Sequence, residues 1–295
     1  MNFLTAKAYA KINLGLDVLR KREDGYHDLR MIMQTIDLYD VVTLEKTTSD
    51  KILVKTNLSY LPTDHRNLVY KAAQVFMERF DIPAGIKITL EKNIPVAAGL
   101  AGGSSDAAAI LCLLNEMFQT GLTREELMHL GVTLGADVPY CILMGTALSE
   151  GIGEILTPLK RMPDCTILLV KPDISISTKY VYTNLKLTPH SRHPDITAMS
   201  KAIENGNLKE LTGCMDNILQ TVTIPRYPVI KEIKHRMKKL GALTALMSGS
   251  GPTVFGIYKD NQMAERAYEY FKNDPGRQVF LTKPYWPDHT PCDFL

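Results

Sequence analysis

Residues 95–109 read Pro95-Val96-Ala97-Ala98-Gly99-Leu100-Ala101-Gly102-Gly103-Ser104-Ser105-Asp106-Ala107-Ala108-Ala109. An apolar run follows at 110–114, and upstream residues 86–91 alternate apolar and polar side chains as a half-buried strand does. The predicted order is therefore strand, glycine-rich loop and helix. Glycines let a ligand approach the backbone closely, and the free N–H groups at a helix start attract an anion. The stretch predicts a phosphate site; the alternative is a tight turn with Ser105 or Asp106 as an ordinary N-cap.

The loop matches neither of the two common phosphate-binding fingerprints, because the sequence has no Gly-x-x-x-x-Gly-Lys-Ser/Thr and no Gly-x-Gly-x-x-Gly after its first strand. It resembles the Pro-x-x-x-Gly-Leu-Gly-Ser-Ser-Ala loop of the GHMP kinases, lengthened by two residues to Gly-Leu-Ala-Gly-Gly-Ser-Ser at 99–105. The longer form is similar to that of the members that act on a cytidine diphosphate-linked alcohol. Ala101 stands where the family more often has glycine, so the backbone conformation at this residue matters for the loop.

The resemblance implies that ATP is the phosphoryl donor and that Mg²⁺ binds near Ser105. The implied ATP contacts in the loop are Pro95, Gly99, Leu100, Ala101, Gly102, Gly103, Ser104 and Ser105. In the same family an Asn and a Lys contact the adenine, and the matching residues here are Asn67 and Lys92. From the residues alone, Asn67 is also suited to cap the helix that the apolar period predicts over 67–77.

Residues 6–18 follow a strand pattern, in which one face carries the apolar side chains Ile12, Leu14, Leu16 and Val18. Lys11 and Asn13 then share the other face. A positive charge beside an amide suits a phosphate or a developing alkoxide, although an ordinary exposed strand face has the same composition. Ala-Lys-Ile-Asn-Leu at 10–14 also resembles the first strand of the GHMP kinases, which implies that Lys11 and Asn13 face the substrate.

Asp137 is a single carboxylate among small and apolar residues in Gly135-Ala136-Asp137-Val138-Pro139. A buried carboxylate must be paired or take part in chemistry. The alternative is that Asp137 caps a turn or a helix. The segment matches the signature of the same kinases, and the resemblance implies that Asp137 is the general base and that Lys11 lies near it.

Two further segments carry aromatic side chains that can stack on a base. Gly25-Tyr26-His27 lies in a polar, turn-rich loop, and an aromatic beside a histidine can hold a base and bond its edge. A surface Tyr-His pair without function has the same appearance. The resemblance implies that Tyr26 and His27 read cytosine, and that Thr178 and Tyr182 close over it from the second half of the chain.

The composition and the net charge exclude several classes of protein. The chain has 295 residues, 45% of them hydrophobic and 22% charged, which is typical of a soluble protein with one large or two ordinary domains. Its 34 basic and 32 acidic side chains leave a net charge of +2, so nucleic acid and membrane are not expected partners. The five cysteines form no Cys-x-x-Cys pair, and no secretion signal or stretch near 18 apolar residues is visible. We expect a cytoplasmic protein with reduced, packed thiols.

Strands and helices mix without a regular βαβ rhythm, which predicts an α+β protein. Strand patterns occur at 31–38, 41–45, 52–55 and 166–170, a hairpin is predicted over 145–154, and helical periods occur at 196–211, 229–240 and 264–271. A second glycine-rich turn within 244–257 resembles the third GHMP motif, although a simple turn between two strands fits equally well. We place a boundary in the proline-containing stretch 157–164, giving domains 1–160 and 161–295.

The resemblance, which covers nearly the whole chain, implies the two-domain GHMP architecture. Its N-terminal ATP-binding domain is like ribosomal protein S5 domain 2, and its C-terminal substrate-binding domain is ferredoxin-like. The implied reaction is transfer of the ATP γ-phosphoryl group to the 2-hydroxyl of 4-diphosphocytidyl-2-C-methyl-D-erythritol, in the non-mevalonate isoprenoid pathway. Two alternatives stay open: a GHMP kinase for another small alcohol, of the homoserine or mevalonate type, and a nucleotide-binding protein without catalysis.

Overall fold

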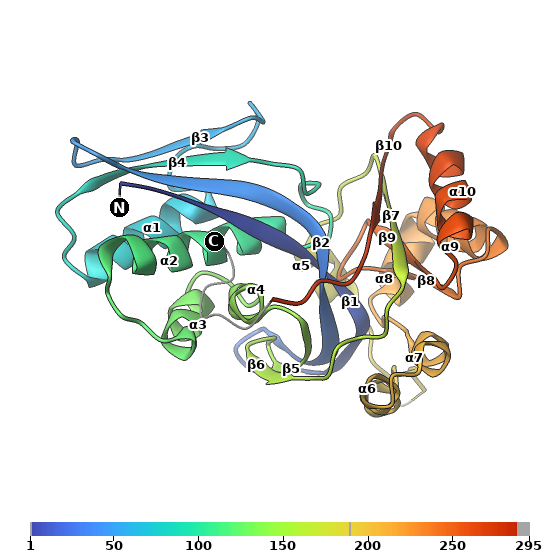
Figure 1. Ribbon diagram of the computed structural model, residues 1–295. Coiled ribbons are helices and arrows are strands. Elements are labelled where there is room, and N and C mark those ends of the chain that lie inside the picture. The colour runs from blue at the N-terminus through green and yellow to red at the C-terminus, as the bar shows by residue number, and fades with distance from the viewer. Residues whose placement is uncertain (1, 189, 288–295) are drawn as a thin grey trace.

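The computed structural model describes residues 2–188 and 190–287, which form two sheets with helices packed on them (Figure 1). The first sheet has the order β3-β4-β2-β5-β6, with β1 paired to β2. Its strands are β1 (Phe3–Lys21), β2 (His27–Thr47), β3 (Ile52–Thr56), β4 (Gly85–Glu91), β5 (Thr146–Gly151) and β6 (Ile155–Pro158). The second sheet is antiparallel with the order β10-β7-β9-β8, from β7 (Thr166–Pro172), β8 (Thr244–Met247), β9 (Val254–Tyr258) and β10 (Arg277–Thr282). The predicted α+β class is confirmed.

The helices occur in two parts of the chain. Those in the first part of the chain are α1 (Leu68–Arg79), α2 (Gly102–Phe118), α3 (Arg124–Val132) and α4 (Val138–Leu143). Those in the second part are α5 (Thr178–Asn184), α6 (Ile196–Glu204), α7 (Leu208–Cys214), α8 (Gln220–Arg226), α9 (Pro228–Lys239) and α10 (Asn261–Lys272). Helices α9 and α10 pack against the second sheet, and α1 and α2 lie together below the first (Figure 1).

One continuous strand, β2, replaces the two strands predicted at 31–38 and 41–45. It pairs with β1 along most of its length, with β5 over residues 29–34 and with β4 over residues 41–47. The expected break around Asp40 does not occur, because the Asp40 carboxylate accepts hydrogen bonds from the backbone N–H groups of Asn93 and Ile94. A carboxylate satisfied in this way can stay inside a sheet. The predicted strand at 52–55 is present as β3, which pairs in parallel with β4.

The prediction that four apolar side chains of β1 share one face is wrong. Ile12 and Leu14 belong to a core cluster that also contains residues of β7 and β9. Leu16 and Val18 belong to the other cluster, with the side chains of α1 and α2. The strand therefore changes the face that it presents to each core between Leu14 and Leu16.

A bulge in β1 explains this change. The register against β2 shifts between Tyr9 and Lys11, where the extra residues lie on β2, between Asn13 and Gly15, where Leu14 is the extra residue on β1, and again between Val18 and Arg20. A bulge adds a residue to one strand and re-aims the side chains that follow it. The short segment between the first two shifts holds Lys11 and Asn13, both buried. Both of these polar side chains line the cavity described below.

Helix α2 is the central element of the first part. Every residue from Ser105 to Leu114 is buried, and the helix packs on β1, α1 and α4. A helix that is covered on all sides belongs to the core. Its first residue, Gly102, follows the glycine-rich loop, so the predicted order of strand, loop and helix is confirmed and the helix start is held firmly.

Other predicted elements are present with changed limits. The helical period over 196–211 is two helices, α6 and α7, because the chain turns between them at Gly206, where φ is +65°. The hairpin predicted over 145–154 is β5 and β6, with its turn at 152–154. The turn predicted within 244–257 connects β8 and β9, which pair antiparallel.

The chain passes from the first sheet to the second between Pro158 and Thr166. The division into domains 1–160 and 161–295 stays a proposal. Backbone bonds connect the two parts across β1, since Leu16 N–H donates to the Asp216 carbonyl at 3.0 Å and Leu16 C=O accepts from Ile218 at 3.0 Å. Leu16, at this junction, lines the cavity described below.

Two expectations from the totals can be compared with the structure. Cys112 and Cys141 are buried and Cys165 and Cys214 half-buried, whereas Cys292 lies outside the described residues. Among residues 2–188 and 190–287, none of the helices combines the length and the hydrophobicity needed to cross a bilayer.

Candidate active site

A cavity of about 1110 Å³ lies between the first sheet, the start of α2 and the turn from β8 to β9. Its walls come from β1, the 24–27 loop, segment 61–68, the stretch 90–106, the start of α4, helix α5 and residues 249–251. These segments are far apart in the sequence. Of the residues predicted as site residues, all but Leu100 and Ser105 line this one cavity.

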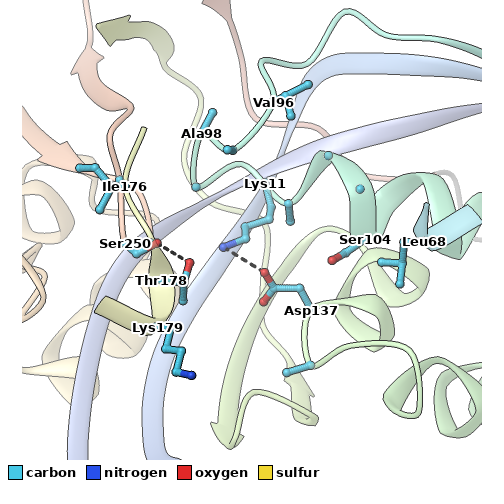
Figure 2. Close-up of a pocket in the computed structure, with 18 of the residues that line it drawn as sticks. Lys11, Leu68, Val96, Ala98, Ser104, Asp137, Ile176, Thr178, Lys179 and Ser250 are labelled. Atoms are coloured by element: carbon cyan, nitrogen blue, oxygen red, sulfur yellow. Dashed lines mark hydrogen bonds and ion pairs between the residues drawn. The ribbon is translucent and has the colours of Figure 1, made fainter. Parts of the chain in front are cut away.

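Lys11 and Asp137, which both line the cavity, lie close to each other. The Lys11 Nζ lies 3.6 Å from Asp137 Oδ2 and donates a hydrogen bond to Asn13 Oδ1 at 2.7 Å. Figure 2 shows the amine of Lys11 between Thr178 and the carboxylate of Asp137. The Lys11 side chain is 5% exposed and that of Asp137 35%. The predicted proximity of the two charges is therefore present, with the carboxylate open to the cavity.

Local geometry frees the Asp137 carboxylate for this contact. Asp137 is the residue before α4, a place where an Asp side chain usually accepts a bond from the helix start. Its side chain makes no such bond in the described structure, and Pro139 in the first turn of α4 has no N–H to offer. The backbone of Asp137 thus occupies a capping position while its carboxylate turns toward Lys11.

The glycine-rich loop is tied to β1 and to the β8–β9 turn. Lys11 N–H donates to the Leu100 carbonyl at 3.1 Å, and the Ser248 hydroxyl donates to the Gly99 carbonyl at 2.8 Å. Gly99 has φ +75°, and a Cβ there would lie 2.2 Å from the Ser248 carbonyl oxygen. Only glycine fits this contact. Ala101 also has positive φ, +58°, so alanine adopts the left-handed conformation that the family usually gives to glycine.

The start of α2 faces the cavity through its backbone. Gly102, Gly103 and Ser104 line it, and by helix geometry their N–H groups have no partner within the helix. A Cβ added to Gly103 would meet nothing within 4 Å, so the space above this residue is open. Three N–H donors with the helix dipole behind them form a site for an anion such as phosphate.

The two serines of the loop differ. Ser104 lines the cavity (Figure 2). Ser105 is fully buried; its hydroxyl donates to the Tyr9 carbonyl at 2.6 Å, and its N–H to the Ala101 carbonyl at 2.9 Å. Both groups of Ser105 are thus engaged inside the protein, which argues against the predicted backbone contact with ATP and the predicted place of Ser105 near Mg²⁺. Leu100 is likewise a core residue, 1% exposed, so a contact with ATP could come only from its backbone.

Lys92 lines the cavity, but two buried carboxylates use its amine. It pairs with Asp40 and, at 2.5 Å, with Asp106 of α2. Burial opposes the charge of Lys92, yet the nearby charges of Asp106 and Asp40 outweigh burial and raise the pKa of Lys92 above its ordinary value. Burial raises the pKa of Asp106 against the opposing charge of Lys92. A side-chain contact from Lys92 to adenine would have to compete with these two partners.

Asn67 is the N-cap of α1, as the alternative reading of this residue holds. Its Oδ1 accepts from the Val69 N–H at 3.2 Å, and its Nδ2 donates to the Pro62 carbonyl at 2.7 Å. Asn67 also lines the cavity, beside Leu68. Its amide is therefore engaged on both sides, although the residue borders the space where a base could lie.

At the far side of the cavity, His27 lies against Tyr182, with ring centroids 5.2 Å apart and an angle of 36° between the planes. Burial, and then the charge of Lys21, lower the pKa of His27, which favours the neutral ring. A neutral imidazole both donates and accepts hydrogen bonds. Tyr26 is 60% exposed at the rim. Thr178 bonds Ser250 Oγ at 2.9 Å, which ties α5 to the β8–β9 turn.

Sequence reasoning missed the partners of Lys92. Asp40 lies 52 residues before Lys92, in a strand pattern without local features, so no spacing connects the two. Ser248 and Ser250 could have been found, because the glycine-rich turn that contains them was recognised. Within the described residues no group of three or more His, Cys, Asp or Glu side chains is arranged to hold a metal ion.

Comparisons with known proteins agree with this geometry. Residues 67–145 match the GHMP kinases N terminal domain and residues 199–277 the GHMP kinases C terminal domain. A 4-diphosphocytidyl-2-C-methyl-D-erythritol kinase of Lachnoclostridium phytofermentans is 56% identical, over 96% of this chain and 98% of that protein. The fold is similar to a crystal structure of 4-(cytidine 5'-diphospho)-2C-methyl-D-erythritol kinase, with a TM-score of 0.81, 32% identity and coverage of 96% of this chain and 100% of that one.

A homoserine kinase from Cytophaga hutchinsonii has a similar fold, with a TM-score of 0.80 over 96% of this chain and 95% of that one, but only 18% identity. That likeness concerns the fold alone. The matches at high identity extend over both halves of the chain, and the cavity joins the segments that carry the motifs. The chain therefore belongs to the GHMP kinases and, among them, to the family of the 4-diphosphocytidyl-2-C-methyl-D-erythritol kinases.

Proposed function

We propose that this protein transfers the γ-phosphoryl group of ATP to the 2-hydroxyl of 4-diphosphocytidyl-2-C-methyl-D-erythritol. One observation carries the proposal: the Lys11–Asp137 pair lies in the same cavity as the N-terminus of α2 and the His27–Tyr182 rings. A phosphate site, a reacting centre and an aromatic base site in one cavity are what a kinase for a nucleotide-linked alcohol needs. The relatives that match most of the chain support this substrate.

ATP fits the residues at the start of α2. The N–H groups of Gly102, Gly103 and Ser104 would hold its phosphates, and the open space above Gly103 leaves room for them. Mg²⁺, which generally accompanies ATP in GHMP kinases, would neutralise charge on the phosphates. Magnesium is often held by one or two protein oxygens together with phosphate oxygens. Among the cavity residues, Ser104 and Asp137 offer such oxygens, in place of the buried Ser105.

The chain's own groups have distinct tasks in this reaction. Asp137 would orient the acceptor hydroxyl and accept its proton, because its carboxylate is open to the cavity. Lys11, held by Asn13, would stabilise the acceptor oxygen as negative charge develops on it. Phosphoryl transfer depends mostly on position and electrostatics, so two charged side chains are sufficient. His27, Tyr26, Tyr182 and Thr178 would hold the cytosine.

The test is ADP release in a coupled assay with Mg-ATP and three acceptors: the cytidine diphosphate-linked methylerythritol, mevalonate and homoserine. We expect turnover with the first alone. Turnover with only mevalonate or homoserine would retain the kinase and discard the cytosine site. ATP binding without turnover on any acceptor would favour the non-catalytic alternative. No feature of the cavity favours either rival.

A further inference from the structure

The charges that line the cavity are mostly held in ion pairs. The paired ones include Lys11 with Asp137, Lys92 with Asp106, and Arg66 with Asp64. Two lining cations, Lys21 and Lys179, form no ion pair with any residue in the ranges 2–188 and 190–287. An uncompensated cation in a cavity attracts an anionic part of a ligand. The proposed reaction assigns no partner to either lysine.

Lys179 lines the same cavity as both ends of the acceptor site. It is the second residue of α5, three positions before Tyr182, so both side chains can lie on the same side of the helix, and both line the cavity. Tyr182 contacts His27 at the base end. Figure 2 shows Lys179 beside Thr178 on one wall, across from Asp137. An acceptor that reaches from the His27–Tyr182 rings to Asp137 lies in the cavity that Lys179 lines.

Lys21, the other lining cation without an ion pair in the described residues, pairs with His27 in the β1–β2 register, which puts it at the base end of the cavity.

Lys179 projects from a helix whose position is fixed, because the Thr178–Ser250 bond ties α5 to the 249–251 turn. The exposed amine of Lys179 keeps its hydration until a ligand arrives.

We propose that Lys179 binds the diphosphate that links cytidine to the methylerythritol, and so is a specificity-determining residue for the acceptor. This inference rests on the proposed function. A nucleoside diphosphate linker carries negative charge between its base and its reacting alcohol, and Lys179 lines the cavity that would hold both. A lysine ammonium contacts such oxygens as a point charge, with strong charge-assisted hydrogen bonds. Lys11 remains with Asp137 for the chemical step.

The experiment compares Lys179→Met and Lys179→Arg with the wild type. Lys186→Met is the matched control, since Lys186 follows α5, is exposed and does not line the cavity. For each variant, the KM for the cytidine diphosphate-linked acceptor, the KM for Mg-ATP and kcat are measured. The inhibition constants of cytidine diphosphate and of cytidine against the acceptor are measured as well.

For Lys179→Met we expect a rise of about tenfold in the acceptor KM and in the inhibition constant of cytidine diphosphate, the size expected for one lost charge-assisted contact. The inhibition constant of cytidine, the ATP KM and kcat should change little. Lys179→Arg should restore most of the affinity, and Lys186→Met should behave as the wild type. A merely structural defect would weaken cytidine and cytidine diphosphate alike.

Two results would overturn the inference, and they differ in what they leave standing. If the wild type turns over the acceptor but Lys179→Met binds cytidine diphosphate normally, the diphosphate contact is wrong and the proposed function survives. If the wild type neither turns over the acceptor nor is inhibited by either cytidine compound, both proposals fail together.

Discussion

Two lysines line the same cavity and each is paired with aspartate, but their surroundings differ. Lys11 has one carboxylate at 3.6 Å, and that carboxylate is 35% exposed. Lys92 has two carboxylates, Asp40 and Asp106, with side chains 0% and 4% exposed. The Lys11–Asp137 pair, the open group, faces the cavity where the reactants would bind. The Asp40–Lys92–Asp106 group, the closed group, is buried inside the protein.

This difference in exposure distinguishes a pair suited to the reaction from a group that stabilises the fold. A pair with an exposed carboxylate can exchange its partner for a substrate hydroxyl at little cost. A buried ion is expensive to leave alone, so its partners are part of the fold. Asp40 also holds the N–H groups at the beginning of the glycine-rich loop, through Asn93 and Ile94. We therefore expect changes at Lys11 and Asp137 to affect rate, and changes at Lys92 to affect stability.

The largest effect is expected for Asp137→Asn. Asparagine keeps the size of the side chain but cannot accept the proton, and loss of a positioned general base typically lowers the rate by about 10²–10⁴-fold. The ATP affinity should be retained, because the start of α2 is unchanged. Steady-state kinetics and ATP titration measure the two quantities. An unchanged kcat would remove Asp137 from the chemical step.

Lys92→Met should destabilise the protein by about 3–5 kcal/mol, the cost of removing one partner from a buried ion pair. The change leaves the Asp40 and Asp106 carboxylates facing each other without a cation. Urea unfolding of the variant and the wild type gives the difference. Lys11→Met is the comparison: since Asp137 stays partly solvated, its loss of stability should be smaller although its loss of rate is larger. Equal losses of stability would contradict the distinction between the two lysines.

The closed group also predicts a pH dependence of stability. Burial raises the pKa of Asp106 to about 7 from the ordinary value of 3.8. Between these values the native carboxyl keeps a proton that the unfolded chain has released. The native state then binds more protons, so this contribution to stability is complete below about pH 4 and is lost as the pH rises through about 7.

The variant Asp106→Asn removes this titration. We expect the difference in unfolding free energy, wild type minus variant, to fall with a slope of up to about 1.4 kcal/mol per pH unit over that window. Urea unfolding at pH 5, 6, 7 and 8 measures it. A difference that stays constant or rises with pH would show that the Asp106 carboxyl is ionised in the native state over the whole range.

The sequence predicted the open group better than the closed one, for a physical reason. Lys11 and Asp137 each stand in a short motif with a recognisable pattern, whereas the Asp40–Lys92–Asp106 group is assembled by strand pairing and leaves no local signal. Even for Lys11 the strand alternation misplaced its neighbours, because bulges shift the pattern.

The helical pattern of α2 does not distinguish Ser105 from Ser104. Ser105 is in helical phase with Ala108, Ala109 and Cys112, and Ser104 with Ala107, Ala108 and Leu111, and all of these alanine, cysteine and leucine residues are buried. Ser104 nevertheless borders the cavity, because it lies in the first turn of the helix. The burial of the Ser105 hydroxyl follows from its bond to the Tyr9 carbonyl on β1, which no local pattern predicts.

The smallest effect is expected at Ala101, in the loop that runs from Lys92 to the contact with Lys11. Its φ of +58° costs an alanine about 1–2 kcal/mol, whereas glycine adopts this conformation freely but gains about 0.4–1 kcal/mol of entropy in the unfolded chain. Ala101→Gly should thus raise the unfolding free energy by up to about 1 kcal/mol and leave the ATP KM unchanged, as urea unfolding and kinetics would measure. A loss of stability would mean that the Ala101 methyl contributes more by packing against the core than its backbone strain costs. The packing of the Ala101 methyl would then help to fix the conformation of the loop, together with Lys92 and Lys11 at its two ends.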